Sequence, residues 1–376
     1  MIDFEKHKNE VQELWEKYNR RENERVPIAF ATDEQFWLKY AGKTFKEFYT
    51  NPKTHLEVQL ETKNFVANNI IGDSVPGIPD RWGVSVQLWM EENEFYDAEV
   101  VYQENDYAWA KCLPLSKEDL LKHLADLDPE VQVKKNSAYK MYLSLCELAE
   151  GKMFLDKPIN IAVPGGSTHG IFTKAAELRG LEQMCMDIYD DPEWVEKYLS
   201  LFTEKTIARI KAWHKIIRGT ELQIPSNSRF HICDDSIQMI SQDVYEQFVL
   251  PHHLKLYNSF NRSGRGMHLC GRSMQHYKTL HDKLGILCID GPGVFADHGE
   301  YLKEFGGGFS FQAQTDHTVL GLGTAEQIED MVKQLLRPET KIPGRFNIIG
   351  FIHKETRLEN IELCYNLVRK YGIIDK

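Results

Sequence analysis

The sequence predicts an α/β fold, in particular a (β/α)8 TIM-type barrel. Mostly helical segments alternate with short apolar runs, and this alternation is typical of a parallel sheet covered by helices. The strand-like runs begin near residues 26, 69, 159, 228, 265, 285, 308 and 345. Several of them end on polar residues, and such barrels carry their active site at that end of the strands. We therefore expect residues 1–376 to form a single barrel domain.

An amphipathic helix is expected before the first strand. Between residues 4 and 21 the apolar side chains Val11, Leu14, Trp15 and Tyr18 recur at helical spacing, which predicts an N-terminal helical extension. The first two strands are expected at residues 25–30 and 69–73, with helices over 36–49 and 54–68 between them.

Residues 75–115 break this rhythm and predict an irregular insertion after the second strand. Glycine and proline punctuate residues 76–79, and aromatic residues crowd the rest of the segment. We interpret it either as an excursion packed by its own aromatic side chains or as a lid over a binding site. Under the second interpretation, Trp82 and Trp89 would contact a substrate.

Strands and helices alternate regularly in the rest of the chain. Strands are expected over 159–163, 228–233, 265–270, 285–289, 308–314 and 345–351, and helices over 136–148, 173–182 and 191–218. Two later helices are expected to begin with a capping box, in which two side chains three residues apart bond each other's backbone. The pairs are Thr324 with Gln327 and Thr356 with Glu359.

Composition and charge predict a globular cytoplasmic protein. The 376 residues carry a net charge of −11 without a basic stripe, so no nucleic-acid partner is expected. No apolar run approaches the ~20 residues that cross a bilayer, and the charged first residues do not form a signal peptide, so no membrane association is expected. The seven cysteines are scattered and odd in number, which indicates free thiols in a reducing compartment.

The most specific local pattern is Met267-His268-Leu269-Cys270-Gly271. On a strand, His268 and Cys270 lie on the same face, because side chains alternate from face to face. An imidazole and a thiol so placed can bind one metal ion, and nitrogen with sulfur suits zinc. The alternative is a buried thiol beside a histidine that hydrogen-bonds a carbonyl group.

Other polar residues follow predicted strands and would lie on the same rim of the barrel. Asp73, Asp234 and Asp235 are candidates for catalysis, the alternative being that they are turn or helix-start residues. Ser167 and Gln312 are candidates for substrate binding. A hydrophobic barrel does not need these polar groups, whereas a water-accessible site does.

Five motifs extend over nearly the whole chain: Arg-Val-Pro at 25–27, TKAAELRG at 173–180, CDDS through Ile-Ser at 233–241, FVLPH at 248–252 and GLGTAEQ at 321–327. Together and in this order they resemble the uroporphyrinogen decarboxylase superfamily. The decarboxylase itself binds tetrapyrrole carboxylates through arginines of an N-terminal segment. The corresponding residues 36–43 contain no arginine, and many carboxylates are poorly bound without guanidinium partners.

The His268-Leu269-Cys270-Gly271 run resembles instead the zinc-dependent, corrinoid-linked methyltransferases of this superfamily, which include the coenzyme M methyltransferases. The resemblance implies zinc held by His268, Cys270 and a further cysteine in the loop after the last strand. Phe351 stands where that cysteine is expected. Either His353 replaces it, or an acid completes the shell, or no zinc is held; the acids considered are Asp234, Asp235 and Asp290.

The function that the resemblance implies is zinc-dependent transfer of a methyl group between a small methylated substrate and a corrinoid (cobalamin) carried by a separate partner protein. Loss of one thiolate leaves the zinc less electron-rich, which favours a Lewis-acid role and demethylation of a substrate such as a methoxylated aromatic compound. Three alternatives stay open: a methylcorrinoid:thiol methyltransferase, a metal-independent decarboxylase that uses the paired aspartates, and a non-catalytic binding barrel.

Overall fold

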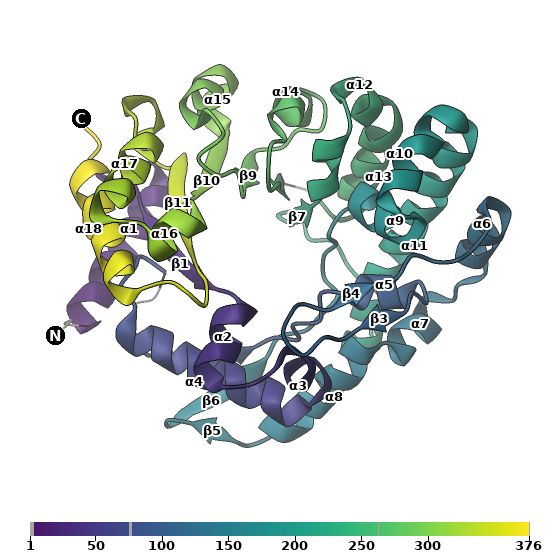
Figure 1. Cartoon of the computed structure of the whole chain (residues 1–376), viewed down its shortest axis with the longest axis horizontal. Coiled ribbons are helices and arrows are strands. Elements are labelled where there is room, and N and C mark those ends of the chain that lie inside the picture. Colours follow the sequence, from purple (N-terminus) through teal and green to yellow (C-terminus); the bar gives the residue numbers. More distant parts are fainter. Residues whose placement is uncertain (1–3, 75–76, 262, 376) are drawn as a thin grey trace.

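Six parallel strands form the central sheet, in the order β1-β11-β10-β9-β8-β7. The computed structural model describes residues 4–74, 77–261 and 263–375. In it, helices lie along the outer side of the central sheet (Figure 1). The six strands are β1 (Ile28–Thr32), β7 (Arg229–Cys233), β8 (Gly264–His268), β9 (Cys288–Asp290), β10 (Ser310–Gln314) and β11 (Phe346–Ile352).

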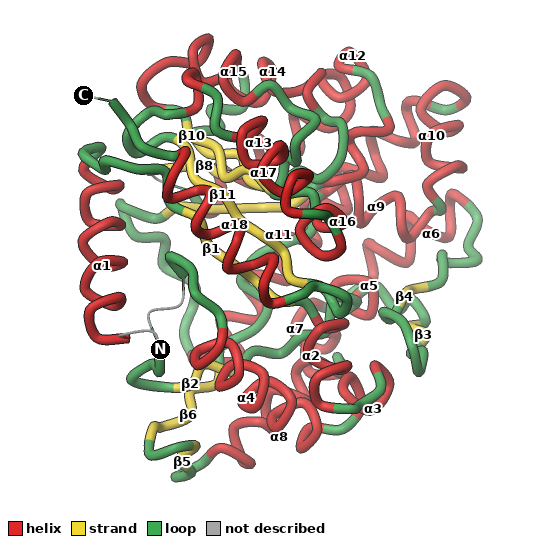
Figure 2. The backbone as a smooth tube through the Cα atoms, turned by 60° about the vertical axis from the view of Figure 1, so that its left-hand side comes forward, coloured by secondary structure: helices red, strands yellow, loops and turns green. Residues whose placement is uncertain are grey.

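A second, smaller sheet lies apart from the first, together with α4 (Pro52–Asn69) and α8 (Ser137–Ala149) (Figures 1 and 2). Its strand β2 (Trp82–Val84) runs parallel to β6 (Lys157–Ile161), and β5 (Met153–Phe154) is antiparallel to β6. Strand pairing within the described residues does not join the two sheets into a closed ring. The predicted α/β class and parallel central sheet are confirmed, whereas a closed barrel is not observed.

The strand predicted at residues 69–73 is replaced by a segment without strand pairing beside β1. Asp73 donates its backbone N–H to the carbonyl oxygen of Ile28 at 2.8 Å. The hydroxyl of Ser74 then bonds both backbone groups of Phe30, at 3.0 and 3.1 Å. A side chain thus makes the contacts that a strand ladder would make. The other seven predicted strands coincide with β1, β6, β7, β8, β9, β10 and β11.

Helices make up most of the remaining chain. Those in the first half are α1 (Phe4–Arg20), α2 (Glu34–Ala41), α3 (Phe45–Thr50), α5 (Glu91–Phe95), α6 (Lys117–Asp126) and α7 (Pro129–Lys135). Those in the second half are α9 (Ile171–Arg179), α10 (Leu181–Asp190), α11 (Pro192–Arg218), α12 (Gln242–Val244), α13 (Leu250–Phe260), α14 (Tyr277–Asp282), α15 (His298–Phe305), α16 (His317–Leu322), α17 (Ala325–Leu335) and α18 (Leu358–Tyr371).

One of the two predicted capping boxes is confirmed. Thr324 and Gln327 cap α17 reciprocally. At α18 the cap residue is Arg357, and the hydroxyl of Thr356 accepts a hydrogen bond from the backbone of His353 instead. The predicted Thr356–Glu359 box is therefore wrong, because the hydroxyl is engaged by the preceding loop.

Helix α1 occupies the segment in which the sequence predicts an N-terminal helix, and it lies beside the C-terminal part of the chain. The ring of His7 contacts that of Tyr365 on α18 edge to face, with centroids 6.2 Å apart. Both chain ends therefore lie on the same side of the molecule (Figure 1).

The aromatic segment predicted over 75–115 is less irregular than expected. Residues 75 and 76 lie outside the described part of the chain; the remainder contains β2, α5 and a small antiparallel pair, β3 (Val100–Val101) with β4 (Trp109–Ala110). Trp82 is 1% exposed, and Phe95 and Tyr96 are also buried. These aromatic side chains belong to the core, as the first of the two interpretations predicts.

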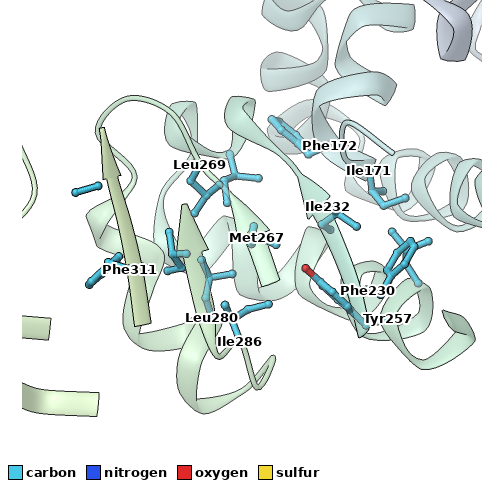
Figure 3. Close-up of a cluster of buried hydrophobic side chains, with 14 of the residues drawn as sticks. Ile171, Phe172, Phe230, Ile232, Tyr257, Met267, Leu269, Leu280, Ile286 and Phe311 are labelled. Atoms are coloured by element: carbon cyan, nitrogen blue, oxygen red, sulfur yellow. The ribbon is translucent and has the colours of Figure 1, made fainter. Parts of the chain in front are cut away.

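The two faces of the central sheet differ in polarity. Phe230, Ile232, Met267 and Phe311 lie on the outer face in a buried cluster with side chains of α9 and α14 (Figure 3). The intervening positions carry polar groups that are half-buried or exposed: His231, Cys233, Cys288, Asp290, Ser310, Gln312 and Gln314. Because side chains alternate along a strand, these polar residues share the inner face of the sheet.

Asp73 fastens the start of β1 instead of contributing to the predicted site. Its buried carboxylate accepts two hydrogen bonds from the guanidinium of Arg25, both 2.7 Å long, and a third from the backbone N–H of Ile28 at 2.9 Å. Ile28 is the first residue of β1, whereas His268 is the last residue of β8. Asp73 therefore has a structural role in place of the predicted catalytic one.

Replacing Asp73 with asparagine is expected to lower the free energy of unfolding by about 3–5 kcal/mol, because the largely buried Arg25 would lose its counter-charge. Urea denaturation of the wild type and the variant measures this. Glu99→Gln, which breaks the exposed Glu99–Lys111 pair, is the control and should cost less than about 1 kcal/mol. Equal losses in the two variants would contradict the role assigned to Asp73.

Candidate metal centre and adjoining cavity

Three potential metal ligands converge at the carboxyl ends of β7 and β8. The ligand atoms of Asp235, His268 and Cys270 all lie within 4.8 Å of one another. His268 closes β8, Cys270 follows two residues later, and Asp235 comes just after β7. Among the described residues, this is the group of histidine, cysteine and acidic side chains that a single metal ion could bridge.

The loop that carries Cys270 is held in a defined conformation. The backbone N–H of Cys270 donates to Oδ1 of Asp235 at 2.6 Å, and Nε2 of His268 lies 3.0 Å from Sγ of Cys270. Gly271 follows with φ of +70°, and a Cβ atom there would lie 2.1 Å from the side-chain oxygen of Gln238. The turn therefore requires glycine at this position.

Asp290, on the inner face of β9, orients the ring of His268 by contacting the nitrogen that faces away from Cys270. Its Oδ2 lies 3.1 Å from Nδ1 of His268, which leaves Nε2 facing Cys270. On the other side, Oδ1 of Asp290 lies 3.0 Å from Nε2 of His231. Burial alone would lower the pKa of His268, but its bonds to Asp290 and Cys270 raise that pKa to about 10.

His231 is a member of this cluster that sequence reasoning missed. Burial would raise the pKa of Asp290, but His231 and His268 together hold that pKa well below its usual range. The sequence could have indicated His231, because it lies two residues before Cys233 on β7 and therefore on the same face of the sheet.

Asp234 caps a helix. It is fully buried and accepts the backbone N–H groups of Ile171, Phe172 and Thr173, at 3.0, 3.0 and 2.8 Å. These are the first residues of α9, whose cap position is Gly170 and so offers no side chain of its own. His253 contributes a further contact at 2.8 Å. The catalytic role predicted for Asp234 is thus replaced by a structural one, because all its acceptor positions are directed into the fold.

His353 does not lie beside His268 and Cys270. Its Nδ1 bonds Oδ2 of Asp33, and its ring packs edge to face on His317 with centroids 4.7 Å apart. It follows β11, which is three strands from β8, or about 14 Å at a spacing of roughly 4.8 Å per strand. Of the alternatives for a third ligand, the structure brings Asp235, and not His353, to His268 and Cys270.

A cavity of about 300 Å³ adjoins this centre. Cys233, which lines it, is the residue of β7 that pairs with His268 on β8. Trp89 forms a second part of the wall; the residue is 42% exposed, and its indole N–H donates to Glu34 at 2.7 Å. The remaining wall residues include Val86, Gln87, Leu88, Ala138, Ser167, Thr168 and His169.

The predicted substrate-binding residues are divided between this cavity and other positions. Ser167 and Trp89 line the cavity. Trp82 is buried in β2, where its N–H donates to the carbonyl oxygen of Phe154 at 2.9 Å, so the structure gives it a core position instead of the predicted substrate contact. Gln312 lies on the inner face of the sheet and donates to Asn347 at 2.8 Å.

A buried ionic cluster forms the floor of the cavity. Arg209, on α11, bonds the carboxylates of both Glu91 and Glu92 as well as the carbonyl oxygen of Ser167. Burial raises the pKa of Glu91, whereas Arg209 and His169 overcome burial and hold the pKa of Glu92 well below its usual range. Sequence reasoning missed this cluster, although a charged residue on the apolar face of α11, next to Ile210 and Trp213, was a usable signal.

A larger cavity of about 460 Å³ opens at the other end of the strands. Arg229, Gly264 and Ser310, the first residues of β7, β8 and β10, line it. The smaller cavity reaches the last residue of β7, Cys233, which pairs with His268, whereas the larger one lies at the amino ends of the strands, so the smaller cavity is the one nearer the candidate metal centre.

The chain belongs to the uroporphyrinogen decarboxylase (URO-D) family, whose model matches residues 122–371. Its fold is that of a methyltransferase from Methanosarcina mazei, with a TM-score of 0.64 at 16% identity over 94% of this chain and 97% of that chain. A B12-independent methionine synthase from a Shewanella species, in complex with selenomethionine, gives a TM-score of 0.38 at 14% identity over 86% and 89%. No curated protein matches the chain by sequence. In the described part of the chain, no helix combines the length and apolarity needed to cross a membrane.

The two neighbouring aspartates are expected to respond differently to substitution. Asp234→Asn should lower the free energy of unfolding by about 2–4 kcal/mol, because a buried, fully bonded charge is lost. Asp235→Asn keeps the oxygen that accepts from Cys270 and should change stability by less than about 1 kcal/mol. Chemical denaturation of both variants tests this pair; a larger loss in Asp235→Asn would refute the division of roles.

Proposed function

We propose that this protein is a zinc-dependent methyltransferase that moves a methyl group between a small methylated substrate and a corrinoid on a separate protein. The observation that carries the proposal is the convergence of Asp235, His268 and Cys270 beside an aromatic-walled cavity. URO-D membership and the fold shared with the Methanosarcina mazei methyltransferase support it. We further propose that the central sheet and the parallel pair β2–β6 are arcs of one (β/α)8 barrel, with the site at the carboxyl ends of its strands.

The donor set fits a catalytic zinc ion. Imidazole nitrogen, thiolate sulfur and carboxylate oxygen are all zinc ligands, and three protein ligands leave a position open for a substrate atom. Asp290 supports this assignment, because metal-binding histidines usually donate their other ring N–H to a carboxylate. The same bond fixes the orientation of the His268 ring.

Held by Asp235, His268 and Cys270, a zinc ion would supply Lewis-acid chemistry at the atom from which the methyl group departs. Asp235 in place of a second thiolate makes the donor set less electron-rich, which favours this role over activation of a thiol. The indole face of Trp89 offers a flat apolar wall for an aromatic substrate, and this favours a methoxylated ring among small methylated compounds.

The corrinoid is proposed to arrive on a partner protein that docks over the open end of the site. The sequence has no corrinoid-binding motif of the Asp-x-His-x-x-Gly type, so the partner must supply the cofactor. We propose both that such a partner protein exists and that the methyl group passes from the methylated substrate to the corrinoid.

Metal content is the first test. The wild-type protein is expected to hold about one zinc ion per chain, and His268→Ala, Cys270→Ala and Asp235→Ala should each lose most of it. Elemental analysis of the purified proteins measures this. His353→Ala is the matched control and should keep its zinc.

A wild-type protein that takes up no zinc would overturn the proposed zinc-dependent methyltransferase. A metal-independent decarboxylase and a non-catalytic binding barrel would then be the remaining candidates. Zinc loss in His353→Ala would instead restore the third ligand predicted from the sequence.

Methyl transfer to free, reduced cobalamin in place of the partner tests the reaction itself. With aryl methyl ethers as donors, Trp89→Ala should raise KM about tenfold, since losing an aromatic contact costs about 1.4 kcal/mol. Trp109→Ala, an exposed tryptophan of the same aromatic segment outside the cavity wall, should leave KM unchanged. No transfer from any methylated donor in a broad panel would refute the proposed function.

A further inference from the structure

A histidine–carboxylate pair stands in the wall of the 300 Å³ cavity. Nδ1 of His169 lies 2.7 Å from Oε1 of Glu92, and the backbone N–H of His169 donates to the same oxygen, also at 2.7 Å. The side chain of His169 is 39% exposed, while that of Glu92 is almost entirely buried. The pair therefore joins a protected carboxylate to an imidazole that is open to the cavity.

Glu92 is fixed too firmly to act by itself. Its second oxygen, Oε2, accepts from the hydroxyl of Thr168 at 2.6 Å and from Arg209 at 2.9 Å. With Arg209 and His169 as neighbours it stays ionised. A permanently ionised carboxylate on Nδ1 selects the tautomer with the proton on that nitrogen.

The other ring nitrogen of His169 is available for chemistry. Within the described residues, Nε2 has no hydrogen-bond partner. The ring meets Trp89 edge to face with centroids 5.5 Å apart, so a planar substrate on the indole would lie beside the imidazole ring. A histidine oriented by a carboxylate and open on its far nitrogen is the arrangement of a general acid–base catalyst.

The segment that carries His169 also contacts the strand end next to the candidate metal centre. The carbonyl oxygen of Thr168 accepts from the backbone N–H of Cys233 at 3.2 Å. Gly170, with φ of +103°, lies so close to Asp234 that a Cβ atom would come within 2.4 Å of its carboxyl carbon. The segment that carries His169 thus lies against the end of β7, immediately before Asp235.

We propose that His169 is a catalytic residue that protonates the oxygen of an uncharged aryl methyl ether as its methyl group departs, an assignment that rests on the proposed function. The O–CH3 bond breaks and its electron pair stays on the oxygen. The methyl group passes to the reduced corrinoid acceptor, which supplies the electron pair of the new bond. His169 acts as the imidazolium: the proton on Nε2 converts the aryloxide to a phenol, while the proton on Nδ1 stays bonded to Glu92. His169 is then reprotonated from solvent.

The charges around the cavity select an uncharged ring over an aromatic acid. Arg209 is the buried cation of the wall, and both neighbouring carboxylates, Glu91 and Glu92, already bond it. A substrate carboxylate on the part of the ring remote from His169 would meet these acids without a free cation to pair with, and burying an unpaired charge is costly. We therefore expect methoxybenzene and methoxyphenols as substrates, and methoxybenzoates to be excluded.

Binding of 4-nitrophenol, whose absorbance reports its protonation, tests the site without methyl transfer. His169→Asn is the variant of choice, because its amide nitrogen can keep the bond to Glu92 while the outer nitrogen is lost. The wild type should bind the probe at least about tenfold more tightly than this variant, the value of one hydrogen bond to a charged group. The control is His281→Asn, which alters another histidine–carboxylate pair, with Asp282 at 2.7 Å, outside the cavity; it should bind as the wild type does.

Rates of methyl transfer to free reduced cobalamin then test the role of the proton. With methoxybenzene, a poor leaving group, His169→Asn should lose about 100-fold in kcat, a typical value for general acid catalysis. With 4-nitromethoxybenzene, whose aryloxide needs little help from a proton, the loss should be less than about fivefold. A structural defect would slow both donors equally.

Equal losses for the two donors, or equal binding of 4-nitrophenol by the wild type and His169→Asn, would overturn the role of His169. Selective binding of the probe without methyl transfer from any donor would overturn the proposed function and leave the His169 ligand site standing. Turnover of 4-methoxybenzoate as fast as 4-methoxyphenol would refute the preference for an uncharged ring.

Discussion

The buried carboxylate of Asp234 holds the two parts of the candidate site together. It follows β7, whose neighbour β8 carries His268, and it accepts the first three N–H groups of α9, which begins just after His169. A carboxylate without partners would be strongly destabilised in this position. Three aligned amide groups at the positive end of a helix, together with His253, supply the missing stabilisation. The candidate metal ligands and the cavity wall are therefore held together by one buried carboxylate.

A second buried charge network serves the same purpose in another part of the cavity wall. Arg209 on α11 bonds Glu91 and Glu92 at the start of α5 and the carbonyl oxygen of Ser167. Three elements distant in sequence meet at one guanidinium, whose planar set of donors can satisfy several acceptors at once. This network orients the carboxylate that in turn orients His169. The polar groups of the cavity are thus fixed by charge pairs in the interior, while Trp89 contributes the apolar surface.

The candidate metal centre departs from the resemblance in its third ligand. The loop after β11 holds Phe351 and His353, and His353 is engaged by Asp33 and His317. Asp235 lies next to Cys270 because β7 and β8 are adjacent in the sheet and because its carboxylate accepts the backbone N–H of Cys270. A carboxylate that follows a neighbouring strand thus lies where the resemblance implies a thiolate from a distant loop, and the number of candidate ligands stays at three.

The sequence by itself determined the features that depend on local spacing. Periodicity located α1 and seven of the eight predicted strands, and the two-residue interval between His268 and Cys270 placed them within reach of one ion. Only the tertiary structure decided which of the acids joins them, that Asp73 clamps Arg25, and that Asp234 caps a helix more than 60 residues before it. His169 and Glu92 are 77 residues apart and lie on no common periodic pattern, so nothing local distinguished them. The physical reason is that periodicity shows which face of an element is buried, whereas the partner of a buried charge is chosen by elements that meet only after the chain has folded.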